Sequence, residues 1–409
     1  MIQSGLTIAQ AEANRLGAES IYYPGISVSG GYTAGTTSIA NVPNSASRTN
    51  GANYNISASQ SIFTWGANKA SVDISKLSVK IAQKQYADAY RQLAVSVRNQ
   101  YLAVIVSKVY LRNAKMAEKR AKDVLTNEED KLKEGRISEG DIIGPRLNVE
   151  DSAIIAERAA VELEHNKRVL INLSGISELP DEEIPESIKS PNFNAEAPRK
   201  LFEQFQLEGA ENTYQGQVYR YQIEQARLNY HIARTGLLPK FSIGGTAGVS
   251  NASSFTNTTV ATVSQKNESV SISGGWTIFN GFATRAAKLS ALASKRLSER
   301  ALKTYVDATI EQARYLQTNL MISARQMSLS NTREALSKSA VSRVKEDFDY
   351  GVASQTMLND VMLEAAGAEL RAASARQDFL NRWVDFLSTI SADPALNNVS
   401  ASYLTRDAK

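Results

Sequence analysis

Four segments of the chain alternate between apolar and polar residues with a period of two, which is the pattern of β-strands. We predict strands at about 24–35, 53–63, 239–250 and 268–279. Their polar positions carry almost only Ser, Thr, Gly and Asn, whereas the wet face of a soluble sheet normally carries charged residues. A membrane barrel turns its apolar face to lipid and lines water with small polar residues. One such strand alone is more typical of a soluble sheet, but all four together favour a membrane barrel.

Four strands are too few to close a barrel, so we predict closure by several copies of the chain, which would remove the exposed sheet edges. The connections at about 35–50 and 250–267 are rich in Ser, Thr, Asn and Ala, as extracellular loops often are. The apolar sides of the strands include Tyr32, Phe241 and Trp276, which we predict to be lipid-facing aromatics.

Two long segments, about 66–134 and 282–349, are rich in good helix formers. Apolar residues of the first recur mostly at spacings of three and four, as in helices that pack lengthwise. Each segment ends at a glycine suited to a left-handed helix terminus, Gly135 or Gly351. Ser138 and Ser354 follow as caps of return helices at about 139–174 and 354–390. The pattern predicts two helical hairpins.

The chain repeats this order with a shift of about 216 residues: Gly135 follows Phe63 by 72 positions, and Gly351 follows Phe279 by 72 positions. Such a duplication predicts an elongated, pseudo-symmetric molecule. The first repeat covers 1–175 and begins with a short helix. The second covers 211–393 and begins with a helix at about 211–235. Four prolines between 180 and 198 mark an irregular connection at 176–210, and a C-terminal tail occupies 394–409.

Charge and composition exclude several function classes. The 46 basic residues are interspersed with 42 acidic ones, and this near-neutral balance argues against nucleic-acid binding. The chain has no cysteine and only two histidines, His165 and His231, which we interpret as structural. No nucleophile constellation, phosphate loop or metal-ligand spacing is present. We therefore predict no enzymatic activity, no cofactor and no metal.

The chain contains no apolar stretch long enough for a membrane helix, and its first residues lack the charged and apolar regions of a secretory signal. Either the protein is cytosolic, or a signal peptide is absent from this sequence.

In the order and spacing of these features, the chain resembles the TolC-like outer-membrane channel proteins of Gram-negative export systems. The resemblance rests on Leu237-Leu238-Pro239 before a strand and on the strand-to-helix exits Ser61 to Gly66 and Thr277 to Gly281. It also rests on the two tip glycines, each followed three residues later by Ser. It implies an α+β fold: a trimeric outer-membrane β-barrel with four strands per protomer and twelve in total, continued by a long periplasmic α-helical barrel. Segment 176–210 would form a belt around that helical barrel.

The resemblance further implies an exit duct of a tripartite efflux pump or a type I secretion system. Its partners would be two further copies of the chain, a periplasmic adaptor, an inner-membrane RND or ABC pump and outer-membrane lipid, with most of the chain in the periplasm. The tip turns implied to contact the adaptor are Gly135, Arg136, Ile137, Ser138, Gly351, Val352, Ala353 and Ser354.

The resemblance implies a periplasmic end that is closed by inward coiling of the inner helices, with acidic rings near these turns that govern cation passage. Nine positions after Gly351 stands Asp360, which matches one family aspartate, whereas Met357 stands where a second is typical. Either one of the two acidic rings is missing, or Glu364 replaces it. In the first repeat Asp141 stands six positions after Gly135, and Arg146 stands where the family often has a basic residue. An alternative interpretation of Asp360 is an ordinary solvated charge on a helix. An alternative interpretation of Asp141 is a residue that the helix dipole favours at a helix N-terminus.

The helical pattern also fits an alternative, a soluble periplasmic coiled-coil scaffold or adaptor whose strands form a small aqueous sheet.

Overall fold

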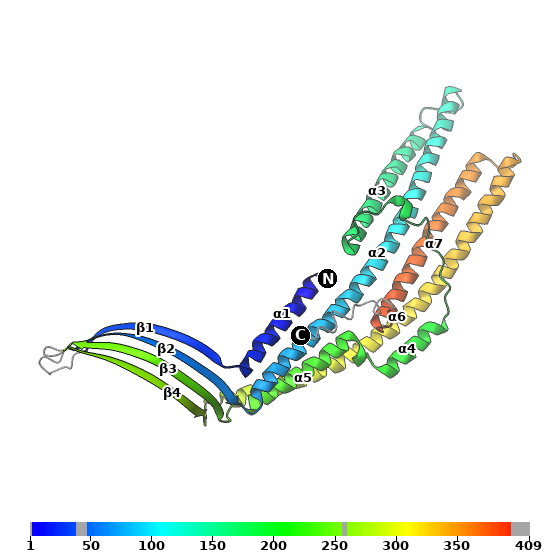
Figure 1. Cartoon of the computed structure of the whole chain (residues 1–409). Helices are drawn as coiled ribbons and strands as arrows, with labels where there is room; N and C mark the ends of the chain where they lie inside the picture. Colours follow the sequence, from blue (N-terminus) through cyan, green and yellow to red (C-terminus); the bar gives the residue numbers. More distant parts are fainter. Residues whose placement is uncertain (1, 38–46, 256–259, 394–409) are drawn as a thin grey trace. The chain divides into compact units, whose positions relative to one another are not determined.

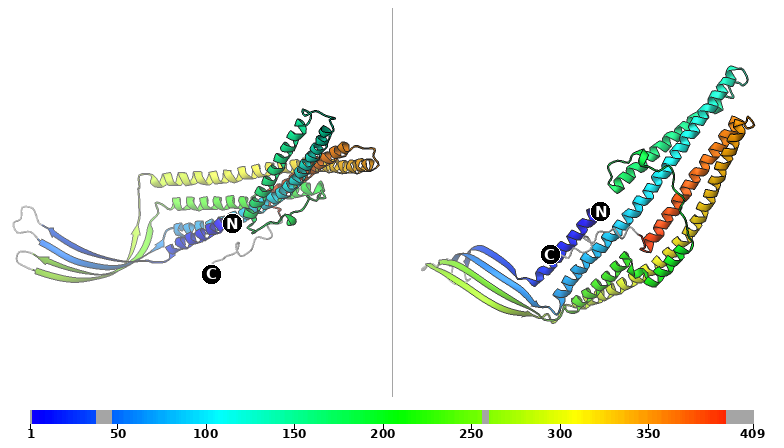
Figure 2. Two further views of the ribbon diagram at one scale, coloured as in Figure 1. Left: turned by 90° about the horizontal axis from the view of Figure 1, so that it is seen from above. Right: turned by 45° about the vertical axis from the view of Figure 1, so that its right-hand side comes forward.

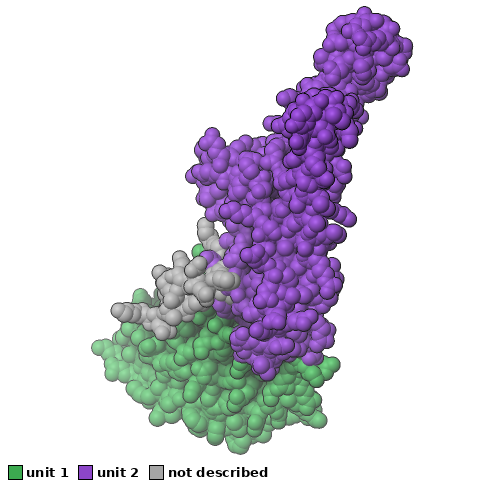
Figure 3. Space-filling model, turned by 90° about the vertical axis from the view of Figure 1, so that its right-hand side faces the viewer, with its two compact units in different colours: residues 1–86, 215–304 green, residues 87–214, 305–409 purple. Residues whose placement is uncertain are grey.

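The computed structural model describes residues 2–37, 47–255 and 260–393. The chain divides into two compact units, one of residues 1–86 with 215–304 and one of residues 87–214 with 305–409 (Figure 3). Each unit takes part of both sequence repeats. None of the helices in the described part combines the length and apolar character needed to cross a membrane.

The first unit contains a four-stranded antiparallel sheet in the order β1-β2-β3-β4 (Figure 2). Its strands are β1 Gly25–Thr37, β2 Ser47–Phe63, β3 Lys240–Phe255 and β4 Val260–Gly275. Strands β1 and β4 each pair on one side only, so the sheet has two open edges. Together with the long helices described below, this sheet confirms the predicted α+β class.

The strands extend further into the predicted loops than the alternating pattern indicated, because backbone pairing between the strands continues where the apolar alternation has ended. Residues 38–46 and 256–259 of those loops lie outside the described residues. At its other end β4 stops at Gly275, not near 279 as predicted. Gly275 pairs with Lys240, and the preceding Pro239 has no N–H with which to continue the ladder.

The two faces of the sheet differ as the sequence predicted. On one face Val28 lies opposite Ile56, and Ile243 lies opposite Ile272. The other face carries cross-strand hydroxyl pairs at 2.7–3.1 Å: Ser27 with Ser57, Ser242 with Ser273, Thr246 with Ser269, and Ser253 with Thr262. The residues of these pairs are uncharged, so most of the polar face carries neutral hydroxyl groups.

Both strand-to-helix junctions place two consecutive residues in the left-handed region. They are Trp65 and Gly66 in the first repeat, and Gly281 and Phe282 in the second. The order of aromatic and glycine is reversed, yet all four residues have φ between +57° and +81°. A bulky residue in this region costs about 1–3 kcal/mol. The strain at Trp65 is offset in part by two hydrogen bonds, from Trp65 Nε1 to the Pro239 carbonyl at 2.7 Å and between His231 Nε2 and the Trp65 carbonyl at 3.1 Å.

Helices of the first unit pack beside the beginning of α2 (Ala67–Lys133). Helix α1 (Ile2–Glu19), which a short 3-10 turn at Ser20–Tyr22 follows, buries Ile8 and Ala11 against Val79 and Ala82 of α2. Helix α5 (Tyr214–Arg234) reaches α2 through Gln225. Its amide donates to the Ile74 carbonyl at 3.1 Å and to Ser78 at 2.9 Å. The first turns of α2 therefore pack on α1 through apolar side chains and are joined to α5 by hydrogen bonds.

The second unit is a layer of four helical segments in the order α3-α2-α7-α6 (Figure 1). Helix α3 spans Ile143–Ser174, α6 spans Ala283–Asp349 and α7 spans Gln355–Thr389. Gln100 and Ser107 of α2 bond to Asn166 of α3. Asn113 of α2 donates to the Ala366 carbonyl of α7 at 2.8 Å. Helices α6 and α7 share a cluster that includes Leu320, Phe379 and Phe386.

Residues 176–212 cross this layer and are anchored on both hairpins. Ile184 and Ile188 are buried against Val104 and Leu163 of the first hairpin. The second half of the segment is not irregular, as was predicted, but forms helix α4 (Glu196–Glu208), flanked by 3-10 turns at Asp181–Glu183 and Ala210–Asn212. Its Phe202 and Phe205 join the cluster of α6 and α7. The burial of these two aromatic residues against the hairpin stabilises a helix that the prolines obscured.

Candidate functional site

The two hairpin tips have the same backbone structure. Gly135 has φ +70° and Gly351 has φ +75°. At the first tip, Gly135 N–H donates to the Leu132 carbonyl and Arg136 N–H to the Lys131 carbonyl, both at 2.9 Å. The second tip repeats both bonds, from Gly351 to Phe348 and from Val352 to Asp347. This is the Schellman motif, in which only glycine avoids strain.

The residues after the two glycines differ. Ser354 caps α7 as predicted, accepting from the Met357 N–H at 3.2 Å. Ser138 does not cap α3, which begins at Ile143 and not near 139. Instead, Ser138 donates its hydroxyl to Asp141 at 2.7 Å and its backbone N–H at 2.9 Å. These hydrogen bonds lower the pKa of Asp141 below its ordinary value, so this carboxylate stays charged and holds the turn.

Asp360 forms an ion pair that the sequence did not reveal. Its carboxylate bonds to Arg120 of α2 and so joins the two hairpins near their tips. Arg120 is mostly buried, whereas the Asp360 side chain is 66% exposed. The helical pattern placed Arg120 on α2, but nothing in it indicated that α7 lies beside that face.

The remaining predicted entrance residues are dispersed. Glu364 lies exposed one turn beyond Asp360, and Arg146 reaches Glu129 of α2 at 3.8 Å. Asp141 is also exposed and lies in the other hairpin. The structure therefore brings Asp360 together with Arg120, while Asp141 and Arg146 keep local partners.

The second tip also exposes apolar side chains. Tyr350 and Val352 are 77% and 79% exposed, and Met357 lies exposed on the first turn of α7. The first tip presents Arg136 instead, paired with its neighbour Glu134 at 2.8 Å. The tips share a backbone but differ in surface chemistry.

The predicted lipid-facing aromatics occupy two kinds of position. Tyr32 lies in β1 and Phe241 in β3, both exposed on the apolar face. Trp276 is exposed but lies one residue beyond β4, so its placement in a strand was wrong. Its indole N–H donates to the Leu237 carbonyl at 2.9 Å, which fixes the ring at the junction of sheet and helices.

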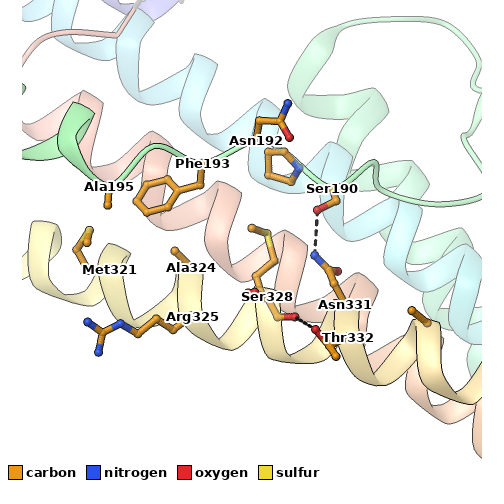
Figure 4. A pocket seen from close by; sticks show the side chains of 13 residues that line it. Ser190, Asn192, Phe193, Ala195, Met321, Ala324, Arg325, Ser328, Asn331 and Thr332 are labelled. Carbon is orange, nitrogen blue, oxygen red and sulfur yellow. Dashed lines mark hydrogen bonds between the residues drawn. The ribbon is translucent and has the colours of Figure 1, made fainter.

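A groove in the second unit lies between α6 and residues 190–195 (Figure 4). Asn331 donates to Ser190 across it at 2.9 Å, and Phe193, Met321 and Met327 provide its apolar lining. The groove holds no convergent set of titratable groups. Within the described residues, no cluster of three or more His, Asp or Glu is suited to a metal ion. His165 lies exposed on α3, and His231 contributes the junction bond described above.

Comparison with known proteins relates this geometry to a family. The sequence matches the family described as outer membrane efflux protein over residues 2–152 and 212–389. No curated protein gives a significant match.

Solved structures with the same fold include the outer membrane channel CmeC of Campylobacter jejuni, with a TM-score of 0.75 and 17% identity over 98% of this chain and 85% of that one. A membrane protein from Pseudomonas aeruginosa matches with a TM-score of 0.73 and 15% identity over 97% and 89% of the two chains. The outer-membrane channel OprN matches with a TM-score of 0.71 and 14% identity over 95% and 86%.

Proposed function

Since this chain belongs to the outer membrane efflux protein family, whose members are outer-membrane channels and not enzymes, we propose that it forms a homotrimeric exit duct. The duct conducts solutes passively from an inner-membrane pump of the RND or ABC type, through a periplasmic adaptor, to the exterior of a Gram-negative cell. Use in type I secretion, with an unfolded protein as cargo, falls within the same proposal.

The observation that carries this proposal is the pairing of an open, two-faced sheet with an open helical layer. One face of the sheet exposes Ile26, Val28, Val270 and Ile272, each more than 70% exposed. An exposed apolar face of this kind is costly in water and is stable against lipid. The hydroxyl pairs of the opposite face would then line an aqueous lumen.

A purified sample tests the proposal directly. We expect detergent-solubilised protein to contain three copies of the 44.6 kDa chain and to open pores in a planar lipid bilayer. The alternative, a soluble coiled-coil scaffold, predicts a stable monomer in detergent-free buffer. A folded trimer without conductance would contradict the exit-duct function.

We assign the channel entrance to Asp360 and Glu364 of the second hairpin, with Asp141 and Arg146 of the first. The ion pair of Arg120 with Asp360 ties the hairpins together near the tips. Three copies of this pair would hold the entrance narrow.

Breaking the ion pair should widen the entrance. We expect Arg120→Gln to raise single-channel conductance several-fold, because it removes an ion pair that joins α2 to α7 near the tips and leaves the Asp360 carboxylates of the three copies without these cationic partners. The exchanged pair Arg120→Asp with Asp360→Arg should restore the low conductance. Arg136→Gln is the matched control, since the partner of Arg136 among the described residues is Glu134 of its own hairpin. An equal rise in the control would refute the role of the pair.

The adaptor would bind the six tip turns of the trimer. The first-repeat turn, Gly135 to Ser138, offers a charged surface, whereas the second, Gly351 to Ser354, offers the apolar side chain of Val352. The adaptor would therefore meet charged and apolar turns in alternation around the six tips of the trimer.

A further inference from the structure

Helices α6 and α7 form a second groove in the second unit. Its volume is about 870 Å³, and its lining residues come from two stretches of these helices, 322–333 and 370–378. Pockets that bind small molecules usually measure about 300–1,000 Å³. The groove is therefore large enough for a small organic molecule.

On α7, the groove lies on the side turned away from the crossing segment, residues 176–212. That segment contacts α7 at Arg376, whose guanidinium group donates to the Ile188 carbonyl at 3.2 Å. Ser374 and Asp378 line the groove, and each stands two positions from Arg376. Two positions correspond to about 200° around a helix, so these side chains leave α7 on the opposite side from the contact with the segment.

Helix α6 has the same arrangement. The crossing segment bonds to Asn331 through Ser190 at 2.9 Å, whereas Leu329 and Arg333 of the groove each stand two positions from Asn331. The groove and the crossing segment therefore lie on opposite faces of the second hairpin. In the proposed duct the crossing segment would form the outer belt, so the groove would open into the lumen.

The charged lining of the groove is cationic. Arg325, Arg333 and Arg371 border it, and within the described residues none of these three guanidinium groups forms an ion pair. Among the described lining residues the single carboxylate is that of Asp378, which is paired with Arg382 at 2.8 Å. The groove therefore carries uncompensated positive charge.

The guanidinium group of Arg371 lies over a glycine of its own helix. A Cβ on Gly367 would be 3.5 Å from Arg371 Nη1 and 3.7 Å from Nη2. Because Gly367 has no side chain, the guanidinium group can lie against the preceding turn of α7. A planar guanidinium group without an acidic partner can offer two parallel N–H donors to a carboxylate, sulfonate or phosphate group.

The lining also includes large apolar side chains. They are Ile322 and Leu329 of α6 and Leu370 of α7. Ile322 and Leu329 are 55% and 53% exposed, so a bound molecule could contact them. Apolar side chains beside unpaired guanidinium groups favour a solute that combines an anionic group with an apolar skeleton.

The polar face of the sheet carries a charge of the same sign at one end. Lys240 pairs with Gly275 and stands two positions before Ser242, so its side chain lies on the hydroxyl-lined side of β3. Among the described strand residues, Lys240 is the only charged residue on that face. Three copies of Lys240 would add positive charge to the lumen of the barrel, which also favours anionic solutes.

We propose that the groove between α6 and α7 is a binding site for organic anions with an apolar skeleton. Arg333 and Arg371 bind the anionic group, and Ile322, Leu329 and Leu370 contact the skeleton. The site deepens the proposed function, because it makes such anions the preferred solutes of the duct. Only the placement of the groove in the lumen rests on that function.

Calorimetric titration of the purified trimer with naphthalenesulfonate tests the site. The trimer is held in nanodiscs of phosphatidylcholine, and the heat of partition into empty nanodiscs is subtracted. We expect saturable binding, and about tenfold weaker binding both of naphthol, which lacks the anionic group, and of methanesulfonate, which lacks the apolar skeleton. Equal affinity for naphthol would refute the role of the guanidinium groups.

Single substitutions locate the site. Arg333→Gln and Arg371→Gln should each weaken the binding of naphthalenesulfonate about tenfold, because each removes a charged hydrogen-bond donor. Arg343→Gln is the matched control, since Arg343 is an exposed arginine of α6 that does not line the groove. Equal weakening by the control would show that the anion responds to the overall charge of the protein and not to this groove.

Asp378→Asn provides a variant with a gain of affinity, which loss of folding cannot imitate. It removes the carboxylate from the lining and frees the guanidinium group of Arg382. We expect naphthalenesulfonate to bind several-fold more tightly, because the groove becomes more positive. Unchanged or weaker binding by a folded Asp378→Asn trimer would overturn the proposal.

The outcomes separate the binding site from the exit-duct function. A trimer that conducts ions but does not bind naphthalenesulfonate would refute the site and leave the function standing. A folded trimer that binds the anion with this dependence on Arg333 and Arg371, but opens no pores, would support the site and contradict the function.

Discussion

Replacing Ile272 by arginine is expected to destabilise insertion of the barrel by about 2–4 kcal/mol, the cost of a basic side chain on the lipid face near the bilayer midplane. Ile272 lies on the apolar face of the edge strand β4 and is 74% exposed. Its cross-strand neighbour is Ile243, so no acidic partner is available on β3. The free energy of folding into lipid vesicles, measured by urea titration, gives the size of the effect.

Ser271→Arg is the matched control, one residue earlier on the same strand. Its side chain lies on the hydroxyl-lined face, where water would solvate the guanidinium group. We expect little change in stability there, together with lower single-channel conductance because the lumen is narrowed and positively charged. If Ser271→Arg were the more destabilising substitution, the assignment of the two faces to lipid and lumen would be reversed.

The face chemistry of the strands could be predicted from the sequence because it is a local property. Alternation at period two fixes which side each residue takes, and Ile56 and Val28 lie on the predicted face. The ends of the strands depend on where the paired strands begin and end, which the pattern within one strand does not show. Trp276 belongs to the alternating pattern, but β4 ends before it because its partner strand begins after Pro239.

The helices, too, have features that follow from local sequence and features that depend on distant contacts. The tip glycines were predictable, since a Schellman turn needs φ > 0 at one position and glycine supplies it. Helix α4 was missed because the nearby prolines indicated an irregular segment, whereas Phe202 and Phe205 stabilise the helix by tertiary burial. Arg120 was missed for a related reason. Its partner Asp360 is 240 positions away, and no spacing rule within one helix joins them.

The exposed apolar residues of helix α6 show what the sequence pattern and the structure each contribute to the description of a surface. The spacing of Tyr315, Ile322, Leu329 and Leu336 is visible in the sequence, but so are many apolar spacings that pack within the chain. Only the structure shows that this one is uncovered. The sheet and the helical layer then have the same property. In the described part of the chain, each is a row of four elements whose two outer members have a neighbour on one side only.

The largest effect within the helical layer is expected at Arg376 of α7. Its side chain, 11% exposed, pairs with the buried carboxylate of Glu334 on α6. It also donates to Asn331 Oδ1 at 2.8 Å and to the Ile188 carbonyl at 3.2 Å. One guanidinium group thus joins both helices of the second hairpin to the segment that crosses the layer.

Arg376→Met should lower the stability of the second unit by about 3 kcal/mol, because removing one partner of a buried ion pair leaves the other charge uncompensated. The loss stays near the lower end of the usual range, since Lys338 still contacts Glu334 at 2.6 Å. Hydrogen exchange of α6 and α7 amides measures this local stability without requiring the whole chain to unfold in one step.

Arg382→Met, on the same helix, is the comparison. Arg382 pairs with Asp378 at 2.8 Å, but both side chains are more than a third exposed, so its loss should cost less than about 1 kcal/mol. The double variant Arg376→Met with Glu334→Leu should recover most of the loss, because it removes the buried charge together with its partner. Equal destabilisation by Arg376→Met and Arg382→Met would show that burial of the Glu334 carboxylate is not what makes Arg376 important.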